Sequence, residues 1–181
     1  MNESQPFDVV RLDGAGAAAA APELAAVLRD CVEGGASVSF LSPLSPARAK
    51  AFWASVAAAV AQGGTALIVA RDAEGIQGTV QLLLSLPENQ PHRAEVAKLL
   101  VHRRARRRGI AEALMVAAER EAIAEHRTLL TLDTASAEAR RVYERLGWNL
   151  AGVIPGYALN PDRTLCDTWV YWKALTAPGV P

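Results

Sequence analysis

Five arginines fall within the six residues from Arg103 to Arg108, between two segments of different pattern. Ala94 to Val101 is rich in branched apolar residues and predicts a strand, whereas Ile110 to His126 repeats apolar residues at helical spacing. Gly109 stands directly before the second segment, where it would let the backbone turn tightly. A strand, a basic turn and a long helix therefore follow one another, and this order limits the fold more than any other feature.

Such a turn is suited to binding phosphate. The first N–H groups of a helix have no partner inside the helix, and the helix dipole adds about half a positive charge at that end. The pattern Arg106-x-x-Gly109-x-Ala111 would place these donors beside charged side chains. We expect arginines 103, 104, 107 and 108 to reach outward to an anion, because five adjacent charges repel one another without one. The alternative is a solvated basic loop that caps a helix.

Composition narrows the choice of partner and compartment. Basic and acidic residues number 19 each, and no aromatic residue interleaves the arginine run, so we expect no nucleic-acid partner. No apolar run reaches the roughly 18 residues of a membrane span, and Met1 to Asp8 lacks the apolar core of a signal peptide. We therefore expect a cytoplasmic protein with no membrane partner. Cys31 and Cys166 stand outside any metal-binding spacing, so two free thiols and no metal are expected.

The 181 residues suit a single domain over residues 1–181, with flexible ends at about 1–6 and 176–181. Strands are predicted at residues 7–12, 65–71, 76–86, 94–101, 129–133, 148–154 and 167–173, and helices at 18–33, 46–61, 110–126 and 137–146. The order β-α-α-β-β-β-α-β-α-β-β predicts an α/β (α+β) fold, in which a mixed central sheet has helices on both faces.

Two blocks of this chain resemble the Gcn5-related N-acetyltransferase (GNAT) family and its fold. The pattern Arg106-x-x-Gly109-x-Ala111 is similar to the family's coenzyme A motif, and the block from Tyr143 to Trp148 is similar to its second coenzyme-side motif. The strong resemblance covers residues 95–172, whereas residues 1–90 resemble the family only in element order. Segments 94–102, 132–134 and 152–159 resemble the tabtoxin resistance acetyltransferases more closely.

The resemblance implies an acetyl-CoA-dependent N-acetyltransferase. Acetyl would pass to a primary amine of a small molecule, such as a toxin- or antibiotic-like amine, by direct attack in a ternary complex. The alternatives are a protein or peptide N-acetyltransferase and a non-catalytic coenzyme A-binding module. The chain would be a monomer or a homodimer, and its acceptor amine is not identified by the sequence.

The resemblance also implies which residues bind the coenzyme. Backbone groups of the strand before the basic turn would hold the pantetheine arm, and the N–H of Leu99 would donate to the oxyanion. Ser136 stands where many members carry asparagine, and it would donate one hydrogen bond to the same arm. The full predicted set is Leu99, Leu100, Val101, Arg106, Arg107, Arg108, Gly109, Ile110, Ala111, Ser136 and Tyr143.

An alkylamine with a pKa of about 10 is protonated at neutral pH, so its acetylation needs a base. Glu95 is the first candidate, because it lies fourteen residues before Gly109, the spacing of the catalytic glutamate in histone-acetylating members. Simple strand alternation would place Glu95, Leu99 and Val101 on one face. Asp133 would share base duty or hold the substrate ammonium. Tyr143 matches the family tyrosine proposed to protonate the leaving thiolate.

The acceptor pocket is the least defined part of the prediction. The family builds it from the loop between the first two helices and from the last strands. The candidates in this chain are Phe40, Trp53, Tyr157, Asp167 and Trp169.

Overall fold

The computed structural model describes residues 6–175 and contains one seven-stranded mixed sheet in the order β1-β2-β3-β4-β5-β7-β6. The strands are β1 (Asp8–Leu12), β2 (Thr65–Asp72), β3 (Gly75–Leu83), β4 (Arg93–Val101), β5 (Leu129–Thr134), β6 (Asn149–Leu159) and β7 (Leu165–Ala174). The helices are α1 (Gly14–Glu33), α2 (Pro46–Ala61), α3 (Ile110–Ala124) and α4 (Ala137–Arg145), with a short 3-10 turn η1 (Arg103–Ala105). This order confirms the predicted fold class. The ends expected to be flexible lie outside the described residues, apart from Pro6.

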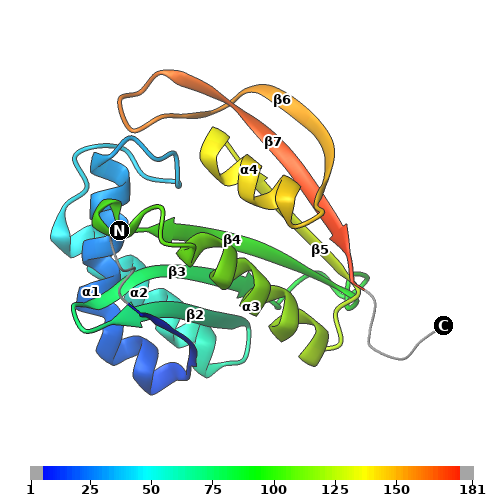
Figure 1. The fold of residues 1–181 in the computed structure, drawn as a ribbon, viewed down its shortest axis with the longest axis horizontal. Coiled ribbons are helices and arrows are strands. Elements are labelled where there is room, and N and C mark those ends of the chain that lie inside the picture. Colours follow the sequence, from blue (N-terminus) through cyan, green and yellow to red (C-terminus); the bar gives the residue numbers. More distant parts are fainter. Residues whose placement is uncertain (1–5, 176–181) are drawn as a thin grey trace.

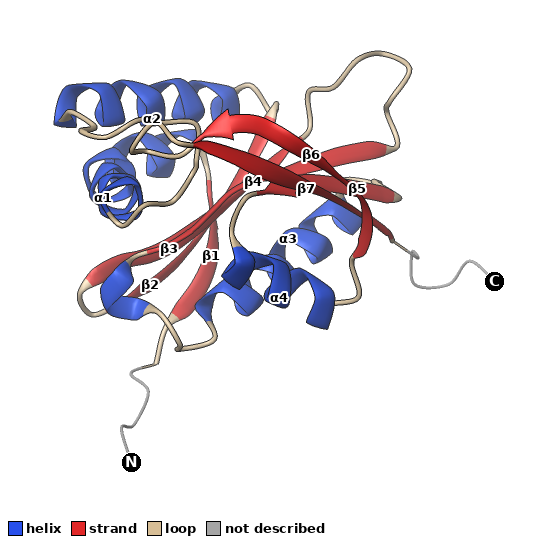
Figure 2. Cartoon of the chain, turned by 90° about the horizontal axis from the view of Figure 1, so that it is seen from above, coloured by secondary structure: helices blue, strands red, loops and turns tan. Residues whose placement is uncertain are grey.

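Helices cover both faces of the sheet, as Figures 1 and 2 show. Helices α1 and α2 pack on one face through a core that includes Leu24, Leu28 and Trp53. Helix α3 packs on the other face through Leu114 and Met115, and α4 contributes Tyr143 to the same core. Alanines on the buried sides of α1 and α2 let these helices approach closely, which explains the alanine-rich composition.

The helix starts follow local capping chemistry. Helix α1 begins at Gly14, four residues before the predicted start, because the side chain of Asp13 accepts a 2.7 Å hydrogen bond from the N–H of Gly16. Ser45 caps α2 in the same way through the N–H of Arg48. Helix α3 differs, since it begins after Gly109 with no side-chain cap. Its first N–H groups are therefore left for another partner.

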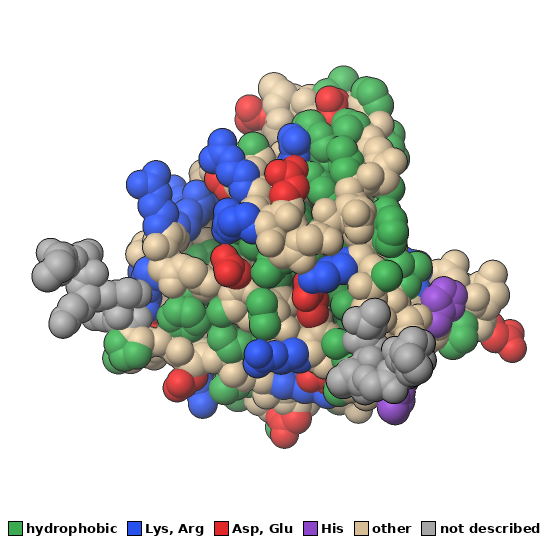
Figure 3. All heavy atoms as spheres, turned by 45° about the vertical axis from the view of Figure 1, so that its right-hand side comes forward, with side chains coloured by type: hydrophobic (Ala, Val, Ile, Leu, Met, Phe, Trp, Pro, Cys, Tyr) green, Lys and Arg blue, Asp and Glu red, His purple; other side chains and the backbone are tan. Residues whose placement is uncertain are grey.

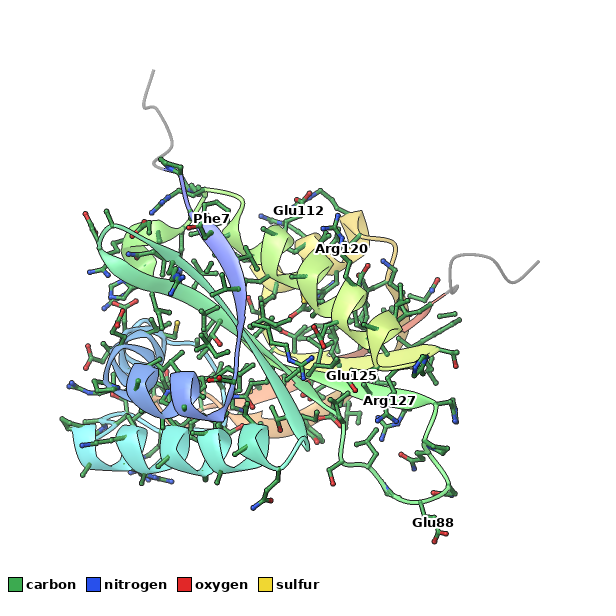
Figure 4. The ribbon with its side chains drawn as sticks, turned by 90° about the horizontal axis from the view of Figure 1, so that it is seen from below. Phe7, Glu88, Glu112, Arg120, Glu125 and Arg127 are labelled. Atoms are coloured by element: carbon green, nitrogen blue, oxygen red, sulfur yellow. The ribbon has the colours of Figure 1, made fainter. Side chains whose placement is uncertain are left out.

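The outer side of α3 carries charges that serve the fold. Figure 4 shows Glu112 and Arg120 along this helix and Glu125 at its C-terminal end. Arg11 of β1 pairs with both Glu121 and Glu125 of α3. The same view places Glu88 on the connection between β3 and β4, pointing away from the rest of the protein. The ion pairs of Arg11 tie α3 to the first strand.

Strands β4 and β5 separate halfway along their length. Their parallel pairing covers only residues 93–95 against 129–131, with Glu95 opposite Thr131 as the last pair. Beyond that pair, β4 continues to Val101 and β5 to Thr134 without facing each other. The edge of β4 over residues 96–101 is therefore open on the β5 side.

A β-bulge interrupts β4 at Lys98, which has a left-handed φ of 51°. On β3, Thr79 pairs with Leu100 and Gln81 pairs with Ala97, so one residue of β3 faces two of β4. The extra residue reverses the side-chain alternation. The prediction that Glu95, Leu99 and Val101 share one face was therefore wrong, because Ala94 and Val96 pack toward α3 before the bulge, whereas Leu99 and Val101 pack there after it.

Candidate functional site

A cleft of about 990 Å³ opens where β4 and β5 separate. The edge of β4 forms one wall, and the start of α4 with the ends of β6 and β7 forms the other. The basic turn and the first residues of α3 line one part of the cleft, and residues 36–41 of the loop between α1 and α2 line another. Most of the residues that the sequence placed in a site therefore line this single cavity.

The basic turn and α3 form one end of the cleft, which we call the anion-binding end because its uncapped helix start and its arginines suit an anion. Arg107 and Gly109 both have positive φ, at 63° and 79°, and this pair of turns presents the uncapped start of α3 to the cavity. A Cβ built on Gly109 would meet nothing within 4 Å, so the space beside this backbone is open. The predicted residues Arg106, Arg107, Gly109, Ile110 and Ala111 all line the cleft here.

The arginine run divides into two groups, which the sequence did not indicate. Arg103 pairs with Asp30 at 2.9 Å, and Arg104 donates a 2.9 Å hydrogen bond to Gln77. Arg108, predicted to bind the coenzyme, pairs with Asp72 at 2.8 Å and is not among the residues that line the cleft. The expectation that these three side chains reach outward to an anion was therefore wrong, because acidic and amide groups elsewhere in the fold bind them.

Asp72 is the centre of this internal network. Its side chain is only 2% exposed, and it accepts hydrogen bonds from Arg108, Gln77 and the N–H of Glu74. Burial alone would raise the pKa of this carboxyl, but the hydrogen bonds outweigh that effect and hold the pKa below its ordinary value. The carboxylate is therefore charged at neutral pH and holds Arg108 against the sheet.

The open edge of β4 carries the predicted pantetheine-binding residues. Leu99, Leu100 and Val101 all line the cleft. Leu99 lies beside the bulge, where neither β3 nor β5 provides it with a paired residue in the strand registers. Backbone groups at this position are therefore placed to bond a ligand that lies along the strand.

Tyr143 and Ser136 come from the α4 side of the cleft. The Tyr143 ring is buried, with ring centroids of Trp148 and Tyr171 both 5.9 Å away. The pKa of the Tyr143 phenol is raised above its ordinary value, mainly because the group is buried and to a smaller extent because Asp133 and Tyr171 are nearby. This phenol is a proton donor at neutral pH. Ser136 caps α4 by accepting from the N–H of Ala139, and its hydroxyl lies 3.1 Å from Glu138.

Three carboxylates reach the same cavity from three strands. Glu95 of β4 lies 3.8 Å from Arg93 and is 39% exposed at its side chain. Asp133 of β5 accepts a 2.8 Å hydrogen bond from Thr168 of β7. Asp167 of β7 accepts a 2.9 Å hydrogen bond from the N–H of Gly156 in β6. The structure therefore brings together the two predicted bases and one predicted acceptor-binding residue.

Lys98 is a cleft residue that the sequence reasoning missed. Its Nζ donates a 3.1 Å hydrogen bond to Oγ of Ser39 and lies 5.9 Å from the centroid of the Phe52 ring. Burial lowers the pKa of this ammonium more than the attraction of Asp133 and Glu95 raises it. An isolated lysine in a strand gives no sequence signal for a site, and the bulge that directs it into the cleft depends on pairing with β3.

The predicted acceptor residues are only partly brought together. Phe40, Tyr157 and Asp167 line the cleft. Trp53 does not, because its side chain is 1% exposed and fills the core between α1, α2 and the sheet. Trp169 faces α4, where the guanidinium of Arg140 stacks on its ring at 4.4 Å. The prediction that these two tryptophans bind the acceptor was therefore wrong.

The remaining sequence expectations concern thiols, metals and membranes. Cys31 and Cys166 are both free thiols, and burial raises the pKa of Cys31 to about 11. Within residues 6–175, no group of three histidine, cysteine or acidic side chains is arranged to hold a metal ion. None of the helices in this part of the chain is long and apolar enough to cross a membrane.

Comparison with known proteins identifies the family. Residues 40–153 match the model of the acetyltransferase (GNAT) domain, which is more than half of the chain. The chain belongs to the GNAT acetyltransferase family. It is an N-acetyltransferase that uses acetyl-CoA.

Solved structures agree on the fold. The N-acetyltransferase from Staphylococcus aureus Mu50 has a TM-score of 0.78 at 16% identity, with 95% of this chain and 100% of that chain covered. The ribosomal-protein-alanine N-acetyltransferase from Brucella melitensis has a TM-score of 0.76 at 18% identity, covering 93% and 99%. A phosphinothricin acetyltransferase from Sinorhizobium meliloti, solved with acetyl-CoA, has a TM-score of 0.74 at 17% identity, covering 93% and 88%. At these identities the likeness establishes the fold.

Proposed function

We propose that this enzyme transfers acetyl from acetyl-CoA to a primary amine of a small molecule by direct attack in a ternary complex. One observation carries the proposal: a single cleft contains an uncapped helix start with two arginines, an open strand edge, a buried tyrosine and three carboxylates. These are the groups that binding a phosphorylated thioester and deprotonating an amine require.

The anion-binding end fits the phosphates of coenzyme A. The N–H groups of Ile110 and Ala111 at the start of α3 would donate to the pyrophosphate. Arg106 and Arg107 would supply positive charge, and neither forms an ion pair with a carboxylate of residues 6–175. Gly109 leaves the backbone open to close approach. These features support the assignment of five of the six predicted residues of the turn, with Arg108 given a structural role instead.

The middle of the cleft has the groups that the transfer needs. The carboxylate of Glu95 would take a proton from the acceptor ammonium, directly or through a water, so that the amine nitrogen can attack the acetyl carbon. The N–H of Leu99 would donate to the acetyl oxygen as negative charge develops there. As the carbon–sulfur bond breaks, the phenol of Tyr143 would give its proton to the departing sulfur, and the phenolate would regain a proton from the attacking nitrogen, directly or through a water. Asp133, held by Thr168, would bind the ammonium before the transfer.

The acceptor end favours a small molecule over a protein. Oγ of Ser37, in the loop between α1 and α2, lies 3.2 Å from the carbonyl oxygen of Leu159 at the end of β6. The N–H of Ser42 in the same loop donates to the carbonyl of Pro161 at 3.0 Å. These contacts join the loop to the β6–β7 hairpin, and Figure 1 shows the two segments meeting. Because the loop and the hairpin contact each other over this end of the cleft, they leave little room for the surface of a folded protein to enter.

One sequence likeness supports the same acceptor class. Segments 94–102, 132–134 and 152–159 resemble the tabtoxin resistance acetyltransferases, which act on an amine of a small toxin. We therefore include toxin- and antibiotic-like amines among the acceptors to be tested.

The test is a screen of acetyl-CoA consumption with amino acids, polyamines, aminoglycosides, β-lactam toxin analogues and N-terminal peptides. We expect turnover of at least one small amine, abolished by combining Glu95→Gln with Tyr143→Phe. Turnover of peptides alone would assign the chain to protein acetylation. Binding of acetyl-CoA without consumption by any amine would indicate a coenzyme-binding module that has lost catalysis.

A further inference from the structure

The acceptor end of the cleft contains charges of both signs. Glu95, Asp133 and Asp167 are carboxylates, and Lys98 lies on the same wall as Glu95. The acceptor ammonium accounts for the carboxylates, but the proposed chemistry gives Lys98 nothing to do. A cation beside the binding site of another cation weakens that site unless the ligand also carries a negative group.

The ammonium of Lys98 retains unused donors. An ammonium has three N–H groups, and the hydrogen bond to Ser39 accounts for one of them. No carboxylate of residues 6–175 lies within the 4.0 Å of an ion pair with it, although Glu95 and Asp133 are near enough to attract it. The Phe52 ring covers another side of the group. At least one N–H is therefore available to a ligand in the cleft.

The backbone holds Lys98 in place for this role. Lys98 and its partner Ser39 both have left-handed φ values, 51° and 74°, which cost energy for residues other than glycine. One belongs to the bulge of β4 and the other to the loop between α1 and α2. Their hydrogen bond joins the central strand to the loop over the acceptor end. The ammonium is therefore fixed before a ligand arrives, which lowers the entropic cost of binding.

We propose that Lys98 binds an oxyanion of the acceptor, so that the substrate is a small amino-acid-like molecule carrying both an amine and an acidic group. The inference rests on the proposed function, because it assigns the acceptor half of that cleft. Glu95 and Lys98 are three residues apart on β4, at most about 10 Å along a strand. This separation fits an acceptor whose amine and acidic group are joined by a short chain.

The test compares acceptors that differ only in the acidic group. The pairs are L-lysine and cadaverine, L-ornithine and putrescine, and L-phenylalanine and 2-phenylethylamine. Two further pairs test other acidic groups. Aminomethylphosphonate is compared with methylamine to test a phosphonate, and taurine is compared with ethylamine to test a sulfonate. We expect the enzyme to prefer the acidic member of at least one pair by about 10- to 100-fold in kcat/KM, the range of one hydrogen bond between charged groups.

Three variants separate recognition from a structural role. Lys98→Met keeps the contact with Phe52 and removes the charge, and it should remove the preference by raising KM for the acidic member alone. Lys98→Arg keeps the charge and should retain part of the preference. Lys50→Met changes an exposed lysine of α2 outside the cleft, and it should leave kcat/KM unchanged for both members of each pair. An equal loss for both members in Lys98→Met would contradict recognition and indicate a structural tether.

The outcome is separable from that of the proposed function. Turnover of at least one amine, together with no preference for the acidic member of any pair, overturns this inference alone. If acetyl-CoA does not raise the melting temperature, or if no amine is turned over, the proposed function itself is overturned.

Discussion

Nη2 of Arg108 donates a hydrogen bond of 2.8 Å to Oδ2 of Asp72, across the turn from the cleft that Arg106 and Arg107 line. The pair divides the basic run into arginines that hold the fold and arginines that face a ligand. Substitutions of Arg106, Arg107 and Arg108 should therefore differ in whether they change ligand binding or stability.

Arg108→Met should destabilise the protein more than it weakens coenzyme binding. The substitution leaves the covered carboxylate of Asp72 without its cation, and breaking a buried pair on one side costs about 3 kcal/mol. In a domain of this size that corresponds to a fall of about 6–12 °C in melting temperature. Calorimetry of unfolding measures it, and a melting temperature equal to that of the wild type would contradict the structural role.

Arg106→Ala and Arg107→Ala should have the opposite effect. Each removes a charged donor from the anion-binding end, so we expect about tenfold weaker binding of coenzyme A and little change in melting temperature. Isothermal titration with coenzyme A measures the affinity. Arg120→Ala, on the outer side of α3 in Figure 4, is the matched control and should bind as the wild type does.

Stability should depend on pH through Asp72 and Asp30. The pKa of each carboxyl is lower in the folded protein than its ordinary value of 3.8. A carboxyl shifted in this direction adds stability above that value, and the gain is lost as pH falls through the folded-state pKa. Asp72→Asn should therefore be less stable than the wild type at pH 7, and the difference should narrow at about pH 3. If the stability difference between Asp72→Asn and the wild type is the same at pH 7 and at pH 3, the ionised carboxylate of Asp72 does not contribute to stability in this way.

Tyr143→Phe should slow turnover while the fold is kept. The phenylalanine ring preserves the packing against Trp148 and Tyr171, so we expect a melting temperature close to that of the wild type. The loss of the proton donor should lower kcat by about 100-fold. Because the pKa of the phenol is raised, the wild-type rate should show no alkaline decline from its ionisation. Steady-state rates between pH 6 and pH 10 test both statements.

Glu95→Gln and Asp133→Asn should differ in the parameter that they change. Because Glu95 is the proposed base, Glu95→Gln should lower kcat by about 100-fold. Raising the pH should restore part of this loss, because more of the amine is then neutral without a base. Asp133→Asn keeps an acceptor for the hydroxyl of Thr168 and should mainly raise KM for the amine. If Asp133→Asn lowers kcat and Glu95→Gln does not, the two roles are reversed.

The sequence was sufficient for the fold and for the position of the turn before α3, because both depend on short segments. The strand, Gly109 and the helix from Ile110 are neighbours in the chain, and the absence of a capping side chain at Gly109 can be read directly. The element order followed from local periodicity. The predicted start of α1 lies four residues too far along the chain, because periodicity in an alanine-rich stretch does not reveal the cap formed by Asp13.

The parts that failed depend on residues far apart in the chain. Arg108 and Asp72 are 36 positions apart, and nothing in the basic run identifies which acid will bind which arginine. The face of β4 after Lys98 depends on a bulge that forms only against β3. Trp53 and Trp169 are aromatic residues near the expected pocket segments in the sequence, but packing between elements places their side chains outside the cleft.

The charged surface of the turn and the apolar surface of the last hairpin are distinct. Exposed hydrophobic side chains gather on β6 and β7, among them Leu150, Ile154 and Leu165, and Figure 3 shows green side chains grouped at the upper part of the molecule. The exposed apolar surface therefore lies on the last hairpin, whereas Arg106 and Arg107 of the turn line the cleft.

The most direct test is a crystal structure of the enzyme with bound acetyl-CoA. We predict pyrophosphate oxygens at about 3 Å from the N–H groups of Ile110 and Ala111, with the side chains of Arg106 and Arg107 beside the phosphates. The acetyl oxygen should lie at the N–H of Leu99, between Glu95 and Tyr143. Coenzyme bound outside the β4–β5 cleft, or an acetyl group away from these residues, would contradict the proposed site.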